Sequence, residues 1–198
     1  MKIIIVGATG TLGKKITESL EKNHDVIKVG SKSGDLQVDI RSADSIEALF
    51  EQTGKFDALI STTGAGYFGP FDKMTDKEFR IGVDSKLMGQ VNLVLIGQHY
   101  INHKGSFTLT SGILADDPVR GSANLAAVNG AINSFVFAAS HELINDVRIN
   151  AISPGVVEDS PHYFSSFPGH IPVSMDKVVA AYLKSVLGIA NGQVIKVY

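Results

Sequence analysis

The chain has 198 residues, of which 44% are hydrophobic and 19% are charged, and its formal net charge is -2. This length supports one sizeable hydrophobic core, so we expect a single domain over residues 1–198. The charge gives no electrostatic surface for nucleic acid or an anionic membrane, and no apolar stretch is long enough to span a bilayer. The lack of cysteine excludes disulfides, thiolate catalysis and cysteine-bound metals.

Short apolar runs alternate with segments of helical periodicity along the whole chain. The apolar runs predict seven strands, at residues 3–6, 26–29, 36–40, 56–61, 106–110, 148–153 and 193–197. The helical segments lie over residues 12–20, 42–52, 75–103, 122–144 and 174–187, with Thr75 and Glu78 as a capping box and Ser174 as a cap. Repeated strand–helix units are typical of an α/β fold, here a Rossmann-type doubly wound parallel sheet of about seven strands with helices on both faces.

Two connections depart from this regular pattern. Residues 30–35 are too few for the crossover helix that normally joins parallel neighbours, so we expect a reduced sheet edge there. Residues 153–174, after the sixth strand, are rich in proline, serine and aromatic residues and show no regular periodicity. The opening apolar run is too short for the core of a signal peptide, which makes a cytoplasmic location the expectation.

The first strand leads into a glycine-rich turn, Gly7-Ala-Thr-Gly10-Thr-Leu-Gly13, which opens the first helix. Glycines at such a turn let the backbone bend tightly and approach a diphosphate, and the helix N-terminus presents free N–H groups to it. A tight turn without a ligand is the alternative. The dinucleotide contacts that we assign to the turn are Gly7, Thr9, Gly10, Thr11, Leu12 and Gly13.

The segment after the second strand, Gly30-Ser31-Lys32-Ser33, has no acidic residue before Asp35. Sites that prefer NAD place an acid here, whereas the 2′-phosphate of NADP needs cations and hydroxyl groups. A lysine flanked by two serines therefore favours NADP as the cofactor, with NAD as the alternative. An ordinary polar surface loop would have the same composition.

These motifs resemble the short-chain dehydrogenase/reductase family along almost the whole chain. The glycine turn has the Gly-x-x-Gly-x-x-Gly spacing of atypical and extended members, and Val147–Gly155 is close to the strand-six motif of the family. The resemblance implies that Asp39 and Ile40 contact the adenine. The further cofactor contacts that it implies are Thr62, Thr63, Gly64, Pro154, Gly155 and Val156.

The same resemblance locates the catalytic residues of the family. Its serine corresponds to Ser111, but the positions of its catalytic tyrosine and lysine hold Leu125 and Asn129, and a shift by one residue gives Asn124 and Val128. Leucine cannot transfer a proton, so the usual acid–base step of the family cannot run through residue 125. The sequence thus resembles a subgroup that keeps the glycine motif and lacks the usual catalytic residues.

Lysine and asparagine are exchanged between two helices, because Lys86 stands where the family has an asparagine. We therefore count Ser111, Lys86 and Asn129 as candidate catalytic residues. We hypothesise that Lys86 reaches the nicotinamide ribose; a lysine that points to solvent is the alternative.

Tyr163 and His162 are further proton-donor candidates, although exposed loop aromatics are more often packing or surface residues. Asp159 stands where the family often has a threonine that contacts the cofactor, and a carboxylate beside a diphosphate is unfavourable.

Two functions remain open. The first is an oxidoreductase that binds NADP(H) and acts on a small carbonyl or alcohol by hydride transfer, with Ser111 polarising the substrate. The second is a catalytically inactive dinucleotide-binding protein, such as a redox sensor or a partner-binding subunit; an empty scaffold is a third, weaker reading. The histidines show no ligand spacing, so we assign no metal. The resemblance implies a homodimer or homotetramer formed through helices 76–103 and 122–144.

Overall fold

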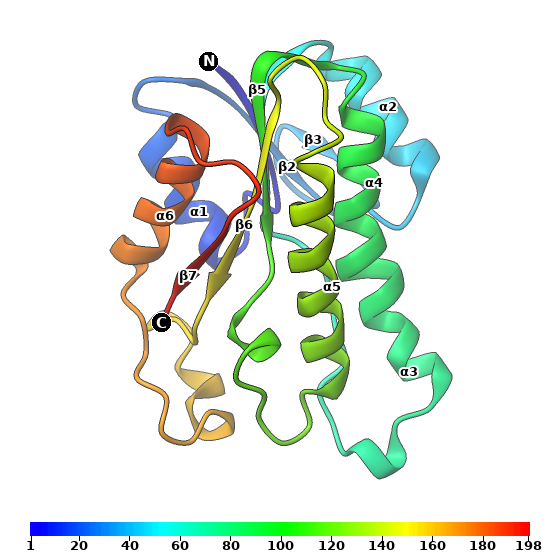
Figure 1. Ribbon diagram of the computed structural model, residues 1–198, viewed down its shortest axis with the longest axis vertical. Coiled ribbons are helices and arrows are strands. Elements are labelled where there is room, and N and C mark those ends of the chain that lie inside the picture. The colour runs from blue at the N-terminus through cyan, green and yellow to red at the C-terminus, as the bar shows by residue number, and fades with distance from the viewer.

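The computed structural model describes residues 1–198 and contains one seven-stranded parallel sheet (Figure 1). Neighbouring strands follow the order β3-β2-β1-β4-β5-β6-β7, and every pair is parallel. The predicted Rossmann-type sheet is therefore confirmed. The strands are β1 (Lys2–Val6), β2 (Asp25–Gly30), β3 (Leu36–Gln37), β4 (Phe56–Ser61), β5 (Ile101–Thr110), β6 (Arg148–Pro154) and β7 (Val194–Val197).

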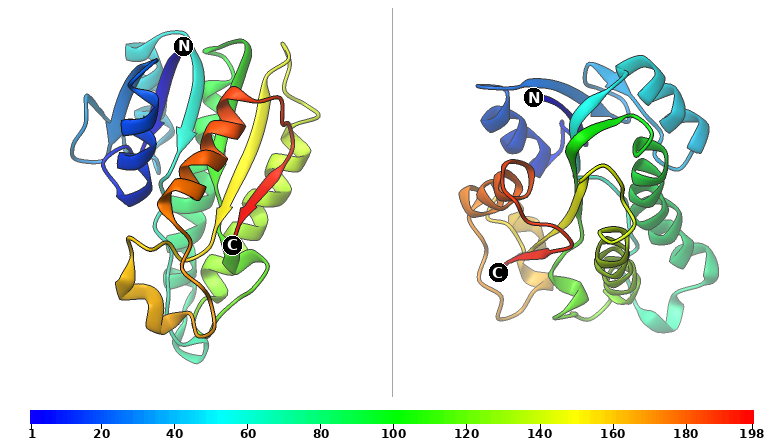
Figure 2. Two further views of the ribbon diagram at one scale, coloured as in Figure 1. Left: turned by 90° about the vertical axis from the view of Figure 1, so that its left-hand side faces the viewer. Right: turned by 45° about the horizontal axis from the view of Figure 1, so that its top comes forward.

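Helices cover both faces of this sheet, as the two views in Figure 2 show. On one face, α1 (Thr11–Leu20) packs beside α6 (Met175–Leu187). The other face carries α2 (Ala43–Thr53), α4 (Met88–Gly97) and α5 (Ala123–Ala139). The alternating inward side chains of the central strands divide between two apolar cores, one under each helical layer. None of the helices combines the length and the apolarity that crossing a bilayer requires.

The long helix predicted over residues 75–103 is broken into three parts and ends earlier. It consists of α3 (Asp76–Ile81), a π-helical turn η2 (Gly82–Leu87) and α4. The predicted capping box of Thr75 and Glu78 is present at its start. The helix stops at Gly97 because the residues that follow pack against other elements. Tyr100 stacks on Phe50 of α2, and Ile101 pairs with Phe56 of β4 in the sheet. Strand β5 accordingly begins five residues before the predicted position.

Two other predicted boundaries and one predicted side-chain cap are wrong for local reasons. Helix α5 ends at Ala139 rather than near residue 144, because Asn145 and Asp146 turn the chain with positive φ angles. Strand β3 has only two residues, since the chain beyond it turns towards α2 and the Asp39 N–H donates to Ser45 Oγ. Ser174 precedes α6, but its side chain makes no capping bond; the carboxylate of Glu158 accepts from the first helical N–H instead.

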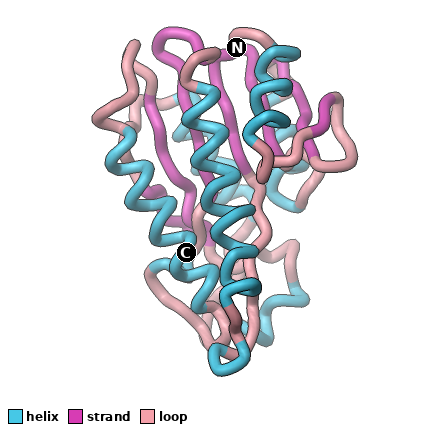
Figure 3. The backbone as a smooth tube through the Cα atoms, turned by 90° about the vertical axis from the view of Figure 1, so that its right-hand side faces the viewer, coloured by secondary structure: helices cyan, strands magenta, loops and turns pink.

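The reduced edge between β2 and β3 is confirmed. Residues 31–35 contain no helix, and the loop closes on itself through two bonds between Lys28 and Asp35. At the carboxyl ends of the strands, loops and short helical turns gather below the sheet, as Figure 3 shows. They include η1 (Phe71–Lys73), η3 (Ile113–Ala115) and η4 (Pro161–Ser166). The carboxyl ends of parallel strands are where ligands bind in such folds, so this end frames the site.

A buried hydroxyl pair joins α6 to the end of β5. Thr110 Oγ1 donates to the Ser61 carbonyl at 2.5 Å and therefore accepts from the Tyr182 hydroxyl at 2.6 Å. Tyr182 is fully buried, and burial raises the pKa of its phenol well above the usual value. The hydroxyl is thus a neutral donor that ties the helix to the residue before Ser111.

Replacing Tyr182 with phenylalanine removes this donor and leaves one side of Thr110 Oγ1 unpaired. We expect the free energy of unfolding to fall by about 1 kcal/mol. Urea denaturation of Tyr182→Phe against the parent chain measures the change. Tyr163→Phe is the matched control, because Tyr163 is 54% exposed and should leave stability unchanged. Equal midpoints for both variants would contradict the assignment.

Candidate functional site

Three chain segments meet at the end of β1 and shape the glycine-rich turn. Gly7 has a φ of 91°, in the left-handed region that favours glycine, and its N–H donates to Val29 O on β2 at 2.7 Å. A Cβ on Gly13 would lie 2.0 Å from Gly7 O, so only glycine lets α1 start this close to the strand. Hydrogen bonding at the start of α1 begins with Lys14 N to Gly10 O. The N–H groups of residues 11–13 therefore remain free to bind an anion.

A cavity of about 1060 Å³ opens in front of this turn. Its wall runs from the glycine turn across the ends of β2 and β4 to α3 and η2. The structure brings together in this wall ten residues expected from the sequence, namely Gly7, Thr9, Gly10, Ser31, Lys32, Asp39, Ile40, Thr62, Thr63 and Gly64. A volume of this size is at the upper end of the range for small-molecule sites.

The other expected cofactor contacts lie outside the wall of this cavity. Ser33 sits beside it, with its hydroxyl 3.2 Å from that of Thr9. Pro154 ends β6, and Gly155 and Val156 follow it at the far side of the sheet, where Val156 is buried. The cavity thus covers the adenosine and diphosphate half of the expected site and not the nicotinamide half.

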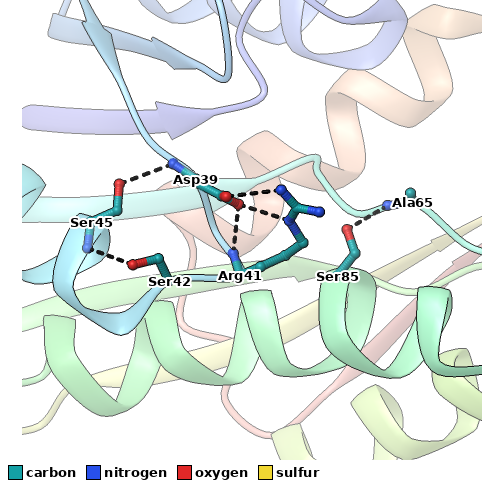
Figure 4. A network of polar contacts seen from close by, with 6 residues as sticks. All are labelled: Asp39, Arg41, Ser42, Ser45, Ala65 and Ser85. Atoms are coloured by element: carbon teal, nitrogen blue, oxygen red, sulfur yellow. Dashed lines mark hydrogen bonds and ion pairs between the residues drawn. The ribbon is translucent and has the colours of Figure 1, made fainter.

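Cations that the sequence motifs do not indicate line the same cavity. Arg41 follows Ile40 and makes two bonds to the Asp39 carboxylate, at 3.0 and 2.9 Å (Figure 4). These bonds hold the pKa of Asp39 below its usual range. Lys77 and Arg80 extend from α3 on the opposite wall. With Lys32, four cationic side chains line the cavity, and two of them are paired with carboxylates that also line it, Arg41 with Asp39 and Arg80 with Asp76.

The end of β4 is held between the glycine turn and η2. Thr62 Oγ1 donates to Gly7 O at 3.1 Å, and the hydroxyls of Ser61 and Thr63 lie 2.8 Å apart. Gly64 has a φ of 116° and packs so closely on Lys86 that a Cβ would lie 2.4 Å from its Cα. Beside it, Ala65 N donates to Ser85 Oγ at 3.0 Å, as Figure 4 shows.

Lys86 is buried, with 9% of its surface exposed, which rules out the solvent-pointing alternative. Its side chain forms no salt bridge and donates no hydrogen bond to another protein group. Burial of the unpaired ammonium lowers the pKa of Lys86 to about 8. The side chain lies on a π-helical turn, a feature frequent at functional sites.

The other two candidate catalytic residues meet at the end of β5. Ser111 is buried and its Oγ lies 3.5 Å from Ile152 O on β6. Asn129 Nδ2 lies 3.5 Å from Gly112 O, the residue after Ser111, and its Oδ1 is buried without a hydrogen-bond partner. An orphaned buried acceptor of this kind is costly to the fold and needs an explanation.

The positions that would hold the tyrosine of the family are filled by packing groups. Leu125 lies against Gly66, where a Cβ would come within 2.3 Å of Leu125 Cδ2. Asn124 is fully buried and bridges the loop after β4 to α3, accepting from Tyr67 N at 2.8 Å and donating to Phe79 O at 2.7 Å. Neither side chain can exchange a proton at neutral pH.

The remaining candidates from the irregular segment lie apart from this cavity. The rings of Tyr163 and His162 pack against each other in η4 at an interplanar angle of 46°, with centroids 4.2 Å apart, and Tyr163 is exposed. Asp159 lines a second, smaller depression between α1 and α6, together with Glu18 and Asp176. The carboxylate therefore does not face the phosphate turn. No three acidic or histidine side chains come together as a metal site.

A sequence profile of the family described as enoyl-(acyl carrier protein) reductase matches residues 2–172. An uncharacterised oxidoreductase of Methylorubrum extorquens is 23% identical, over 80% of this chain and 74% of its own length. A short chain dehydrogenase of Claviceps purpurea is 30% identical over 74% of this chain, and the match spans only 61% of that relative.

Solved structures extend the likeness over the full chain. The crystal structure of the protein lin1944 from Listeria innocua is 45% identical with a TM-score of 0.98, and covers 100% of both chains. A small-chain dehydrogenase in complex with NADPH is 28% identical with a TM-score of 0.89, over 100% of this chain and 96% of its own. The chain belongs to the short-chain dehydrogenase/reductase family of oxidoreductases.

Replacing Lys86 with methionine removes a buried, unpaired charge and keeps the apolar stem. Because the pKa of Lys86 is lower in the folded than in the unfolded chain, the unfolded state binds more protons between pH 8 and 10.5, and the parent chain gains stability as pH rises there. We expect Lys86→Met to be more stable below pH 8 by up to about 3 kcal/mol, with the difference shrinking towards pH 10.5. Thermal unfolding of both proteins across pH 6–10 measures it, and a difference that does not vary with pH would contradict the burial of the charge.

Proposed function

We propose that the protein is an NADP(H)-dependent oxidoreductase that acts on a small carbonyl or alcohol. The observation that carries the proposal is the cavity in front of the glycine turn, which combines free helix N–H groups with a cationic edge. The small-chain dehydrogenase whose structure contains NADPH has the same fold over the full length of this chain.

The turn fits the diphosphate of a dinucleotide. The N–H groups of residues 11–13 have no acceptor within the helix, and the positive end of the α1 dipole adds to their attraction for anions. The close contacts at Gly7 and Gly13 keep side chains out of this space. Thr9, Thr62 and Thr63 supply hydroxyl groups along the wall.

The adenosine end supports NADP as the preferred cofactor. Lys32 and Arg41 line the cavity beside Ser31, and no acid occupies the tip of the loop after β2. Asp39 would repel a phosphate, but its charge is neutralised by the bidentate pair with Arg41. A guanidinium held in this fixed geometry still has donors available for a 2′-phosphate.

A bound nicotinamide would supply hydride chemistry, and the residues of the chain would position the substrate. Ser111 directly follows β5, and its hydroxyl would polarise a substrate oxygen, with Asn129 beside it. Both residues lie at the carboxyl ends of the strands, on the side where Pro154 and Gly155 would border the nicotinamide.

A dinucleotide-binding protein without catalysis is the second candidate function, and the packing of Leu125 favours it. Gly66 covers the position from which the family donates its proton, so this chain needs another donor to act as an enzyme. The two functions share the cofactor and differ in turnover alone.

We also propose that two copies of the chain associate through α4 and α5. These helices hold 10 and 17 residues without a single charged side chain, although one side of each faces outward. Leu95 and Phe137 are 47% and 64% exposed on them. Surface helices normally carry charges on the outer face, so an uncharged pair is typical of an interface.

Substitution of either Lys32 or Arg41 should weaken the binding of NADPH more than the binding of NADH. We expect Lys32→Ala and Arg41→Ala each to weaken NADPH binding about 10- to 100-fold, since each removes one charge-assisted contact to the 2′-phosphate. The dissociation constant for NADH should change less than threefold. Calorimetry with both nucleotides measures these values, and Lys184→Ala on the opposite face is the control. Equal losses for NADH and NADPH would contradict the proposed phosphate contact.

Charges placed on the uncharged helices should separate the copies. We expect the double variant Leu95→Lys, Phe137→Lys to run as a monomer in light scattering at concentrations where the parent chain is a dimer or tetramer, because two buried ammonium groups would face each other. Leu187→Lys, on α6 at the opposite face and 52% exposed in the parent, should leave the mass unchanged. An unaltered mass for the double variant would rule out this interface.

A further inference from the structure

The ammonium group of the buried lysine on η2 makes no polar contact within the fold. The stem of the lysine lies against Gly64 in the cavity wall. Ser85, the preceding residue, also lines that wall. A charged group on a largely buried side chain, without a protein partner and next to a ligand cavity, points to a partner supplied by the ligand.

A buried glutamine connects this turn to the end of β5. Gln90 is fully buried, and its Nε2 donates to Lys86 O at 3.2 Å and to Thr110 O at 2.9 Å. Its Oε1 accepts from Thr110 N at 2.8 Å. All the polar atoms of the side chain are therefore used to hold Lys86 beside the strand end that carries Ser111.

The surroundings of Lys86 contain few other charges. Three helices pack against η2, and two of them, α4 and α5, have no ionisable residue. On the third, Arg80 is paired with Asp76, and Asp84 on η2 itself is exposed. Helix α3 also carries Lys77 and Glu78, the latter bonded to Thr75 N, and Tyr67 is the first ionisable residue in the loop after β4. No carboxylate neutralises the ammonium, so its proton is available to a ligand.

We propose that Lys86 is the acid of the reaction and protonates the substrate oxygen in place of the missing tyrosine. This role rests on the proposed NADP(H)-dependent oxidoreductase function and deepens it. As the carbonyl carbon gains a hydride from the reduced nicotinamide, the C=O π electrons move onto the oxygen. The oxygen takes a proton as one Lys86 N–H bond breaks. The products are the alcohol, the oxidised nicotinamide and a neutral lysine amine, which solvent reprotonates.

The position of Lys86 suits this chemistry. In the proposed function the substrate oxygen would lie by Ser111 and Asn129 at the end of β5, and the Gln90 bridge sets η2 against the same strand end. A pKa of about 8 keeps most of the ammonium protonated at neutral pH and still lets it give up the proton readily. Carbonyl reduction should therefore slow as pH rises through about 8, and alcohol oxidation should accelerate.

Two substitutions test the acid role, with the full chain as the protein. Lys86→Met removes the proton and Lys86→Arg keeps the charge but cannot release a proton near neutral pH; Lys184→Met, at an exposed position of α6, is the control. With NADPH and 4-nitrobenzaldehyde or an α-diketone as probes, we expect turnover to fall about 10²- to 10⁴-fold in both Lys86 variants. The affinity for NADPH should stay within threefold of the parent value.

A second readout does not need turnover. In protein labelled with [ε-¹³C]lysine, we expect the resonance that is lost in Lys86→Met to titrate near pH 8 and to shift when NADP⁺ is added.

Four outcomes would overturn the assignment. In the NMR experiment, they are a Lys86 resonance that titrates above pH 10 and a Lys86 resonance that does not shift when NADP⁺ is added. In the turnover assay, they are Lys86 variants that keep turnover within fivefold of the parent and a parent protein that binds NADPH but reduces neither probe. A tenfold loss of NADPH affinity with an unchanged pH profile would assign Lys86 to the ribose instead and also overturn the acid role. Absence of NADPH binding to the parent chain would remove the proposed function itself, and calorimetry detects that failure separately.

Discussion

The structure depends on the close approach of backbone segments at the end of β1. Gly7 donates to β2 through Val29 O and accepts from Thr62 at the end of β4, while Gly13 brings the first turn of α1 against Gly7 O. The contacts at Gly7 and Gly13 require glycine, and the contact at Thr62 requires a short side chain with a hydroxyl group. The same arrangement leaves the helix N–H groups unpaired, so the packing constraint of the fold and its capacity to bind an anion have one physical origin.

The sequence predicts those strands and helices whose position is decided by neighbouring residues in the chain. The apolar runs of β1, β4 and β6 and the caps of α2 and α3 were predictable, because burial on both faces and side-chain capping leave clear patterns. Boundaries decided by tertiary contact were not. Helix α4 gives way to β5 because Tyr100 and Ile101 pack on Phe50 and Phe56, which are distant in sequence. Helical periodicity alone would have continued to His103.

The site was predictable to a similar extent. The glycine turn and the ends of β2 and β4 have motifs of fixed spacing, and ten of the residues they indicate line one cavity. Arg41, Lys77 and Arg80 belong to no motif, and only the folded chain brings them to the adenosine end. The burial of Lys86 was open as well, since a lysine in a helix is ordinarily exposed; its enclosure results from Gly64 and from the turn on which it lies.

The π-helical turn at residues 82–87 rotates the side chains of α3 about the helix axis relative to those of α4. A π turn holds one residue more than an α-helical turn, and each residue of an α-helix rotates the chain by about 100°. With that extra residue, α3 can aim its basic side at the cavity while α4 keeps Leu93 and Val94 in the core. Loss of a single residue here would restore a continuous helix, but one of its two ends would then present the wrong side chains. One extra residue in the helix therefore allows α3 to line the ligand cavity while α4 packs into the hydrophobic core.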